Sequence, residues 1–401
     1  MRFPRIRVFL FLRQIISWTH LGIRRIGTTA VRNRPDPQQG EIENQREMEM
    51  PIEMNQDRRR FFGTAAIAAA AAQLGLLNSA VAHAGDANPG AAAAVTAGQG
   101  ANSSFGALKQ INAGLLNIGY AEAGPANGPA VILLHGWPYD IYSFVDVAPL
   151  LASAGYRVIV PYLRGYGTTQ FLSSETVRNG QQAVVAVDII ALMDALKIDK
   201  AILGGFDWGA RTVAAMAILW PERCKALVCV SGYLIGSPAA NKLPSPPAAE
   251  YAFWYQYYFA TETGRAGYDK NRHDFNKLIW RTASPKWNFS DATFERTAAS
   301  FSNPDHVAIV IHNYRWRIDV AEGESKYDDL EKRLAERPAI ALPTITMEGE
   351  ANGAAHPPAA AYRAKFTGKY DYRLIGNGVG HNLPQEAPDA FAKAVIDVDH
   401  F

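Results

Sequence analysis

One segment of the sequence places an aspartate where its carboxylate could act as a nucleophile. Residues 205–209 read Gly-Phe-Asp-Trp-Gly; apolar residues 201–204 precede them, and a helical pattern over 210–220 follows. A nucleophile between small residues, on a tight turn from strand to helix, forms a nucleophile elbow, in which glycines let the two backbones approach closely. A carboxylate at this point attacks saturated carbon and forms an ester, which water must then hydrolyse. A simple helix cap is the alternative role for Asp207, but a cap requires neither glycine.

A histidine near the end of the chain could supply the base that such an ester requires. His381 follows a predicted strand at 370–375 and two glycines, and it precedes a predicted helix at about 388–398. A neutral imidazole there can take a proton from the hydrolytic water. The alternative is a structural loop histidine. The chain has nine histidines, and the others lack such a setting and are interpreted as surface or packing residues.

The elements that must position these two residues alternate between strand and helix patterns, which indicates a mostly parallel α/β sheet. Residues 233–337 interrupt this alternation and contain many aromatic side chains. An insertion at this point would form a helical lid over the carboxyl edge of the sheet, where doubly wound folds bind ligands. Such a cavity suits a small, moderately apolar substrate together with water. The remaining strands are predicted at 130–134, 157–160, 226–230 and 343–347, and the remaining helices at 144–154 and 183–196.

Four motifs together resemble those of epoxide hydrolases in the α/β-hydrolase superfamily, whose near relatives include haloalkane and haloacetate dehalogenases. The motifs are the aspartate elbow, His-Gly-Trp-Pro at 135–138, Gly380-His381 with Glu-Ala-Pro at 386–388, and two tyrosine segments in the lid. The resemblance covers about residues 106–401. It implies an α/β-hydrolase fold: a mostly parallel sheet flanked by helices, with a helical lid inserted after the sixth strand. The core would comprise residues 106–232 and 338–401, and the lid residues 233–337.

The resemblance also implies roles for several further residues. The backbone N–H groups of Trp208 and Trp137 would form the oxyanion hole. The side chains of both tryptophans, with that of Arg211, would line the substrate pocket. Tyr255 and Tyr314 match the two lid tyrosines that protonate the oxygen of an opening epoxide. In so aromatic a lid, a tyrosine that only packs is the competing interpretation.

Dehalogenation is the alternative reaction for the same nucleophile, because a departing halide needs N–H donors instead of an acid. The Trp208 indole could provide one, but Trp137 stands where haloalkane dehalogenases usually carry asparagine. Haloacetate dehalogenases hold the substrate carboxylate with arginines one and four residues after the nucleophile. Here these positions are Trp208 and Arg211, so only one of the two arginines is present. The resemblance therefore favours an epoxide and leaves a haloalkane or haloacid as the alternative substrate.

The charge-relay acid of the family is missing from this sequence. Asn352 aligns with it, and residues 231–233, at the other position that can carry the acid, are not acidic. Glu348 and Glu350 are nearby but lie at other offsets. An amide can orient an imidazole but cannot stabilise an imidazolium by charge, and the same exchange in a serine triad costs about 10⁴-fold in rate. The departure keeps open an enzyme that releases its ester slowly, or a small-molecule binding protein on a hydrolase scaffold.

Composition excludes several other classes of protein. The net charge of +2 gives no reason to expect nucleic acid as a partner. The sequence contains no P-loop, dinucleotide fingerprint, Gly-x-Ser-x-Gly elbow or Cys/His metal spacing, so no cofactor and no metal are expected. Cys224 and Cys229 lie on one predicted strand, too far apart to bridge, and are predicted to be free buried thiols.

The first part of the chain resembles an export signal. Arginines at 58–60 precede a short alanine- and leucine-rich run, 65–77, and then an Ala-x-Ala pattern. This order predicts a twin-arginine signal peptide over 48–84, a periplasmic location and no stable membrane span in the mature form. Methionines just upstream of the arginines suggest that residues 1–47 are a gene-model extension, and residues 85–105 read as a flexible linker.

Overall fold

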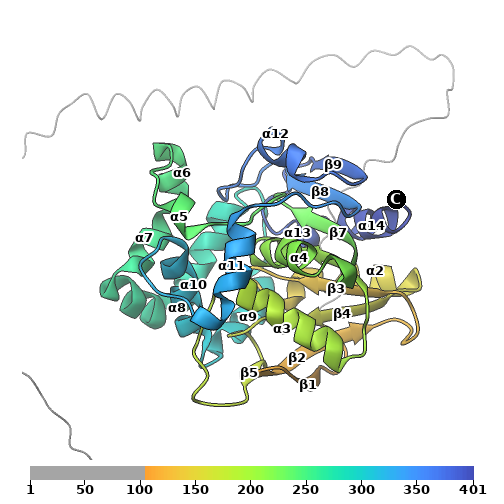
Figure 1. Cartoon of the computed structure of the whole chain (residues 1–401), viewed down its shortest axis with the longest axis horizontal. Helices are drawn as coiled ribbons and strands as arrows, with labels where there is room; N and C mark the ends of the chain where they lie inside the picture. Colours follow the sequence, from red (N-terminus) through yellow and green to blue (C-terminus); the bar gives the residue numbers. More distant parts are fainter. Residues whose placement is uncertain (1–103) are drawn as a thin grey trace, which may run out of the picture. The chain divides into compact units, whose positions relative to one another are not determined.

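The structure is a computed structural model that describes residues 104–401 (Figure 1). All of these residues belong to one compact unit, Ala91–Phe401. The predicted extension 1–47, the predicted signal peptide 48–84 and nearly all of the predicted linker 85–105 lie outside the described residues.

A single mixed sheet organises the described part of the chain. Its strands follow the spatial order β1-β2-β4-β3-β6-β7-β8-β9, and β5 pairs with β2 at the side. All neighbours from β4 to β9 are parallel, whereas β1, β4 and β5 each run antiparallel to β2. The bounds are β1 (Lys109–Ala113), β2 (Leu116–Ala123), β3 (Ala130–Leu134), β4 (Arg157–Pro161), β5 (Gln170–Phe171), β6 (Ala201–Gly205), β7 (Cys224–Val230), β8 (Thr344–Gly349) and β9 (Tyr370–Ile375).

Helices cover both faces of this sheet. Helices α3 (Gln182–Ala195) and α4 (Trp208–Leu219) pack against each other, and so do α2 (Val147–Ser153) and α14 (Pro388–Asp399). Adjacent glycines of β6 show that the two pairs lie on opposite faces: a Cβ at Gly204 would meet Phe391 of α14, and one at Gly205 would meet the backbone of α4. The parallel order and the flanking helices confirm the predicted α/β-hydrolase fold.

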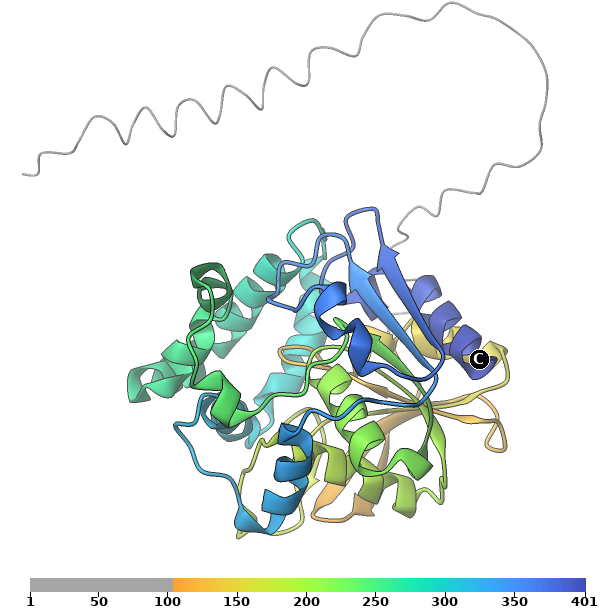
Figure 2. The same ribbon diagram turned by 45° about the horizontal axis from the view of Figure 1, so that its top comes forward.

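The chain leaves the sheet after β7 and returns at β8, and the intervening segment is helical. In Figure 2 its green and cyan helices gather to one side of the sheet. Strand β7 is the sixth strand when the two-residue β5 is left out. The helices are α5 (Pro238–Asn241), α6 (Pro247–Ala252), α7 (Trp254–Ala260), α8 (Glu262–Ala283), α9 (Asp291–Ala298), α10 (His306–Arg317) and α11 (Asp328–Ala335).

The last of these helices departs from the predicted lid boundary. Helix α11 packs on α3 and α4, and the Glu331 carboxylate accepts hydrogen bonds from the Ala183 N–H at 2.9 Å and Gln182 Nε2 at 3.0 Å. It therefore belongs to the helical layer of the core. The lid proper ends with α10, because α11 docks on the core by placing its Glu331 carboxylate at the N-terminus of α3.

The lid is fixed to the core by buried hydrogen bonds near the end of β3. The Trp280 indole donates to the Pro138 carbonyl at 2.7 Å, and the Trp137 indole donates to the Tyr268 hydroxyl at 2.9 Å. Indole N–H groups that are buried need such partners. The position of the lid over the segment 135–140 is thus set by the same residues that carry the His-Gly-Trp-Pro motif.

The remaining elements agree with the sequence-based expectations to within a few residues. The predicted helix 144–154 starts at Val147, because a short 3₁₀ turn, Ile141–Phe144, capped by Asp140, comes first. Cys224 and Cys229 are buried free thiols, as predicted. None of the helices within 104–401 combines the length and apolar character that a bilayer span requires. Two short helices, α12 (Ala359–Tyr362) and α13 (Leu383–Glu386), complete the described chain.

Candidate active site

Asp207 sits on the turn between β6 and α4, as the elbow motif predicts. Its backbone has φ 52° and ψ −119°, a conformation that non-glycine residues rarely adopt. The turn is so tight that a Cβ at Gly209 would clash with the Leu134 carbonyl, and one at Gly205 would press on the Gly209 backbone. The strained turn raises the carboxylate above the end of the sheet, where it faces the lid.

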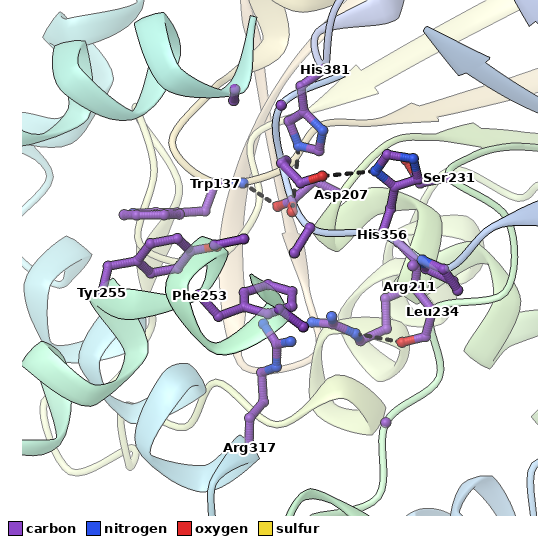
Figure 3. Close-up of a pocket in the computed structure, with 18 of the residues that line it drawn as sticks. Trp137, Asp207, Arg211, Ser231, Leu234, Phe253, Tyr255, Arg317, His356 and His381 are labelled. Atoms are coloured by element: carbon purple, nitrogen blue, oxygen red, sulfur yellow. Dashed lines mark hydrogen bonds and ion pairs between the residues drawn. The ribbon is translucent and has the colours of Figure 1, made fainter. Parts of the chain in front are cut away.

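The two carboxylate oxygens of Asp207 have different surroundings (Figure 3). Oδ1 accepts a hydrogen bond from the Trp137 backbone N–H at 2.8 Å, whereas Oδ2 lies 3.7 Å from His381 Nε2. Burial raises the pKa of Asp207, but His381, Arg211 and the Trp137 N–H outweigh it and hold the pKa below its ordinary value. The carboxylate is therefore ionised at neutral pH, with Oδ1 held and Oδ2 free to attack.

One of the two predicted oxyanion donors is thus in place. The Trp137 N–H already binds the carboxylate oxygen that would carry the negative charge of a tetrahedral intermediate. Its peptide bond to Pro138 is cis. The Trp208 N–H, at the first residue of α4, remains a predicted second donor.

The loop that carries His381 is held by two buried residues. The Ser284 hydroxyl, just past the end of α8, accepts from the His381 backbone N–H at 2.9 Å and donates to Glu386 Oε1 at 2.7 Å. Glu386 also accepts from the backbone N–H groups of Gly380 at 2.6 Å and Asn382 at 3.1 Å. These bonds flank His381 on both sides and fix the direction of its ring.

Asn352, at the charge-relay position, does not contact His381. Its Nδ2 donates to Glu348 Oε1 at 2.7 Å and to Ser231 Oγ at 3.3 Å, and its Oδ1 accepts from the Ala354 N–H at 2.9 Å. The expectation that Asn352 could orient the imidazole is therefore wrong, because its amide is hydrogen-bonded to these three groups instead.

Neither of the alternative acids replaces it. Glu348 is buried and bonded to Asn352, with its second oxygen 3.5 Å from His356 Nε2, and Glu350 is exposed. The buried Nδ1 of His381 has no hydrogen-bond partner among residues 104–401. The base is consequently oriented through its backbone and neighbours, without a carboxylate on its far nitrogen.

This arrangement makes the relay position testable by a pair of changes. Asn352→Asp alone would set a second carboxylate against Glu348, so we expect little gain. Asn352→Asp with Glu348→Gln removes that repulsion and supplies a carboxylate at the relay position. We expect about tenfold faster ester decay in the double variant, well short of a complete relay. Single-turnover kinetics would measure the decay, with Glu348→Gln as the matched control; equal rates in all three would contradict this interpretation.

A cavity of about 620 Å³ opens at the Asp207 carboxylate. Trp137 and Arg211 line it, as predicted, but Trp208 does not, because its ring is buried against Tyr166 and Tyr314. The predicted pocket role of the Trp208 side chain is therefore wrong. The polar and aromatic groups of the lining include Trp137, Asp207, Arg211, Ser231, Tyr255, Arg317, His356 and His381.

The two predicted lid tyrosines lie together but are not equivalent. Their ring centroids are 5.3 Å apart in an edge-on arrangement, and both rings pack on Trp137. Tyr255 of α7 lines the cavity, whereas Tyr314 of α10 is only 1% exposed and lies outside the lining. Burial, together with the charge of Asp207, raises the pKa of both phenols. Both are thus protonated at neutral pH, and Tyr255 can donate to a bound ligand.

The indole N–H groups are not available to a leaving halide. The Trp137 indole N–H donates to the Tyr268 hydroxyl at 2.9 Å. Trp208 Nε1 is buried, and Trp208 does not line the cavity. The donors in the cavity wall include instead the Tyr255 phenol and the guanidinium groups of Arg211 and Arg317.

The cavity wall includes residues to which the sequence assigned no pocket role, among them Ser231, Arg317 and His356. The sequence predicts that all histidines except His381 are surface or packing residues, and this prediction is wrong for His356. His135 is a packing residue as predicted, and its burial lowers its pKa to about 4. Arg317 could have been found from spacing, because it lies three residues after Tyr314 on the same helix, and such residues share a face.

Comparisons with known proteins agree with this geometry. A family model described as alpha/beta hydrolase fold matches residues 129–303. The chain is 61% identical to a Klebsiella pneumoniae protein provisionally named an epoxide hydrolase, whose crystal structure superposes with a TM-score of 0.73 over 73% of this chain and 97% of that one.

Two curated relatives match a shorter stretch. Epoxide hydrolase B of Mycobacterium tuberculosis is 36% identical over 149 residues, which is 34% of this chain and 41% of that protein. An epoxide hydrolase of Caballeronia sordidicola is 39% identical over 104 residues, 26% of this chain and 31% of the relative. The chain thus spans less than half the length of these curated relatives.

Proposed function

This chain belongs to the α/β-hydrolase family as an epoxide hydrolase-like member, and we propose that it hydrolyses an epoxide to a diol through an ester on Asp207. One observation carries the proposal: Oδ1 of Asp207 is held by the Trp137 N–H, and Asp207 lines the same cavity as the half-buried, protonated Tyr255. Nucleophile and acid thus meet in one enclosed space.

In the first half of the reaction, Asp207 Oδ2 forms a bond to an oxirane carbon and the bond from that carbon to the ring oxygen breaks. The ring oxygen takes the phenolic proton of Tyr255, so that no free alkoxide has to form. Tyr314, whose ring packs edge-on against Tyr255, supports the phenolate that results.

In the second half, His381 takes a proton from water as the water oxygen attacks Cγ of Asp207. The Trp137 N–H binds the oxyanion of the tetrahedral intermediate. Collapse breaks the bond between Cγ and the ester oxygen, and that oxygen takes the remaining proton of the attacking water, so the diol leaves with the original Oδ2 and Asp207 returns as a carboxylate. The imidazolium then returns its proton to the phenolate.

The tyrosines allow a test of the acid. We expect Tyr255→Phe to lower the rate of epoxide opening by about 10²- to 10⁴-fold, because the alkoxide then leaves unprotonated. Tyr314→Phe should have a smaller effect, since its hydroxyl is outside the cavity, and the double variant should lose activity altogether. Rapid-quench measurement of diol formation checks this, with Tyr257→Phe on the exposed side of α7 as the matched control. Full turnover by the double variant would rule out both tyrosines as acids.

Dehalogenation is the less supported activity of the same nucleophile. Neither the Trp137 indole N–H, which is bonded to Tyr268, nor the buried Trp208 indole N–H is available to stabilise a departing halide. A product screen of the purified protein with small epoxides, haloalkanes and haloacids tests the proposal. Diol from an epoxide is the expected product; halide release without diol would favour dehalogenation, and neither product would contradict an enzymatic role.

We propose in addition that the protein is exported. The support is the sequence of residues 48–84, with arginines at 58–60 before a short apolar run. Fractionation of the native cells, followed by N-terminal sequencing of the purified protein, would test it. A start near residue 85 in the periplasm is the expected result; a cytoplasmic protein that retains the arginines would contradict the proposal.

A further inference from the structure

Two arginines share the wall of the active-site cavity. Arg211 comes from α4, one helical turn after the nucleophile, and Arg317 is the last residue of α10 in the lid. Figure 3 shows the two side chains reaching toward one another beside Asp207. The Nε group of Arg211 donates to the Leu234 carbonyl at 2.9 Å, which leaves its terminal nitrogens for the cavity.

Within residues 104–401, no carboxylate forms an ion pair with either guanidinium. A fully buried arginine elsewhere in the core shows what this chain does when a guanidinium is only structural. Arg164 makes two hydrogen bonds to the Asp188 carboxylate, at 2.6 and 2.7 Å, and one to a backbone carbonyl at 2.6 Å. Because buried charges are normally paired, the buried Arg211, which has no carboxylate partner and faces the partly buried Arg317, needs a different explanation.

The nearest acidic groups are committed elsewhere. Asp207 is held by the Trp137 N–H and faces His381. Glu331, which lies behind Arg211, gives both oxygens to other donors, and burial raises its pKa to about 7. Burial and the charge of Arg317 together lower the pKa of Arg211 to about 10, so Arg211 is still charged at neutral pH.

Aromatic rings hold Arg317 in its position. Its guanidinium carbon lies 5.3 Å from the centre of the Tyr314 ring and 5.5 Å from that of Phe253. Stacking of this kind orients a guanidinium without using its N–H groups. A planar, oriented and unpaired guanidinium is suited to a carboxylate, which it can bind through two parallel hydrogen bonds.

We propose that the substrate carries a carboxylate, and that Arg211 and Arg317 bind this carboxylate while Asp207 attacks the oxirane a few bonds away. The inference rests on the proposed epoxide hydrolysis and names its substrate class, a short epoxy acid. The short separation follows from the position of Arg211, about 5.4 Å along the helix axis from the elbow. A ligand anion would also relieve the repulsion between the two arginines.

The competing explanation is that the arginines only tune the reacting groups. Both act electrostatically on Tyr255, and Arg211 also acts on Asp207. A tuning role would affect charged and neutral substrates alike, whereas a binding role would affect only substrates with a carboxylate. Pairs of substrates that differ in this one group therefore separate the two explanations.

The experiment compares glycidate with glycidamide and 3,4-epoxybutanoate with its amide, each as kcat/KM for diol formation by the whole protein. We expect the acid of at least one pair to be preferred by tenfold or more. Arg317→Gln should lower that preference by about ten- to a hundredfold, and Arg317→Lys should retain part of it because the charge is kept. Arg333→Gln, an exposed arginine on α11, is the matched control and should leave the preference as it is.

Two results would overturn the proposal: preference for the amide in both pairs, or equal losses on acid and amide in Arg317→Gln. A binding measurement tests the anion site separately from the reaction. Butanoate, which cannot be opened, should bind the unmodified protein more tightly than butanamide, and Arg317→Gln should abolish the difference. If no epoxide is opened but this difference is found, the anion site stands and the proposed reaction falls. If diols form but butanoate shows no advantage, the reaction stands and the anion site falls.

Discussion

Asp207→Asn is expected to lower the turnover of every epoxide substrate by at least about 10⁴-fold, with no covalent adduct left on the protein. An amide does not form the alkyl ester on which both halves of the reaction depend. Stopped-flow or product assays would give the rate, and intact-protein mass spectrometry would show whether an adduct forms.

Asparagine is the appropriate replacement because the backbone at this position is strained. With φ 52° and ψ −119°, residue 207 lies outside the regions that non-glycine residues usually adopt, and asparagine keeps the size and branching of the aspartate there. The variant should therefore unfold within a few degrees of the unmodified protein in a thermal melt. Activity within tenfold of the unmodified protein, with the fold intact, would remove Asp207 from the mechanism.

His381→Gln is expected to separate the two half-reactions. The epoxide should still open, because Asp207 and Tyr255 are unchanged, but ester hydrolysis should slow by about 10²- to 10⁴-fold. One equivalent of substrate should then be consumed in a burst, and the protein should accumulate as the ester. Mass spectrometry of the quenched protein measures the adduct, and rapid quench measures the burst.

The control for this change is His273→Gln, since His273 is an exposed histidine of α8, paired with Asp274 and Glu295. It should turn over like the unmodified protein. Steady turnover by His381→Gln, with no burst and no adduct, would show that another group activates the water. His356, the other histidine of the cavity wall, would then be the first candidate.

Because Asn352 occupies the relay position, the second half-reaction, ester hydrolysis, tells more about this site than the first. In this chain, Ser284 and Glu386 hold the loop of His381, and its Nδ1 has no partner within 104–401. An imidazolium without a hydrogen-bonded carboxylate is less stabilised, so ester hydrolysis is expected to be slower than ester formation.

The fold could be predicted from sequence because its central strands are short, buried and apolar. Strand β3, Ala130–Leu134, lies where the hydrophobic pattern predicts it. The elbow could be predicted because only glycine fits at positions 205 and 209, so the two glycines themselves indicate the tight turn.

The direction of individual side chains could not be predicted in the same way. Asn352 aligns with a relay acid, yet its bonds to Glu348 and Ser231 depend on how the turn after β8 folds. The pairing of Arg317 with Arg211 depends on how the lid docks on the core. The contact of Asn352 with Ser231 and the approach of the two arginines each join segments more than a hundred residues apart, and local patterns carry no information on them.

The central claim is that an ester on Asp207 is the intermediate, and a single turnover in water enriched in oxygen-18 tests it most directly. Water attacks Cγ of Asp207 in this mechanism, so the heavy oxygen should enter the carboxylate of the peptide that contains Asp207. The first equivalent of diol should contain none. Heavy oxygen in that first diol, with an unlabelled Asp207 peptide, would mean that water attacks the epoxide directly and would contradict the account.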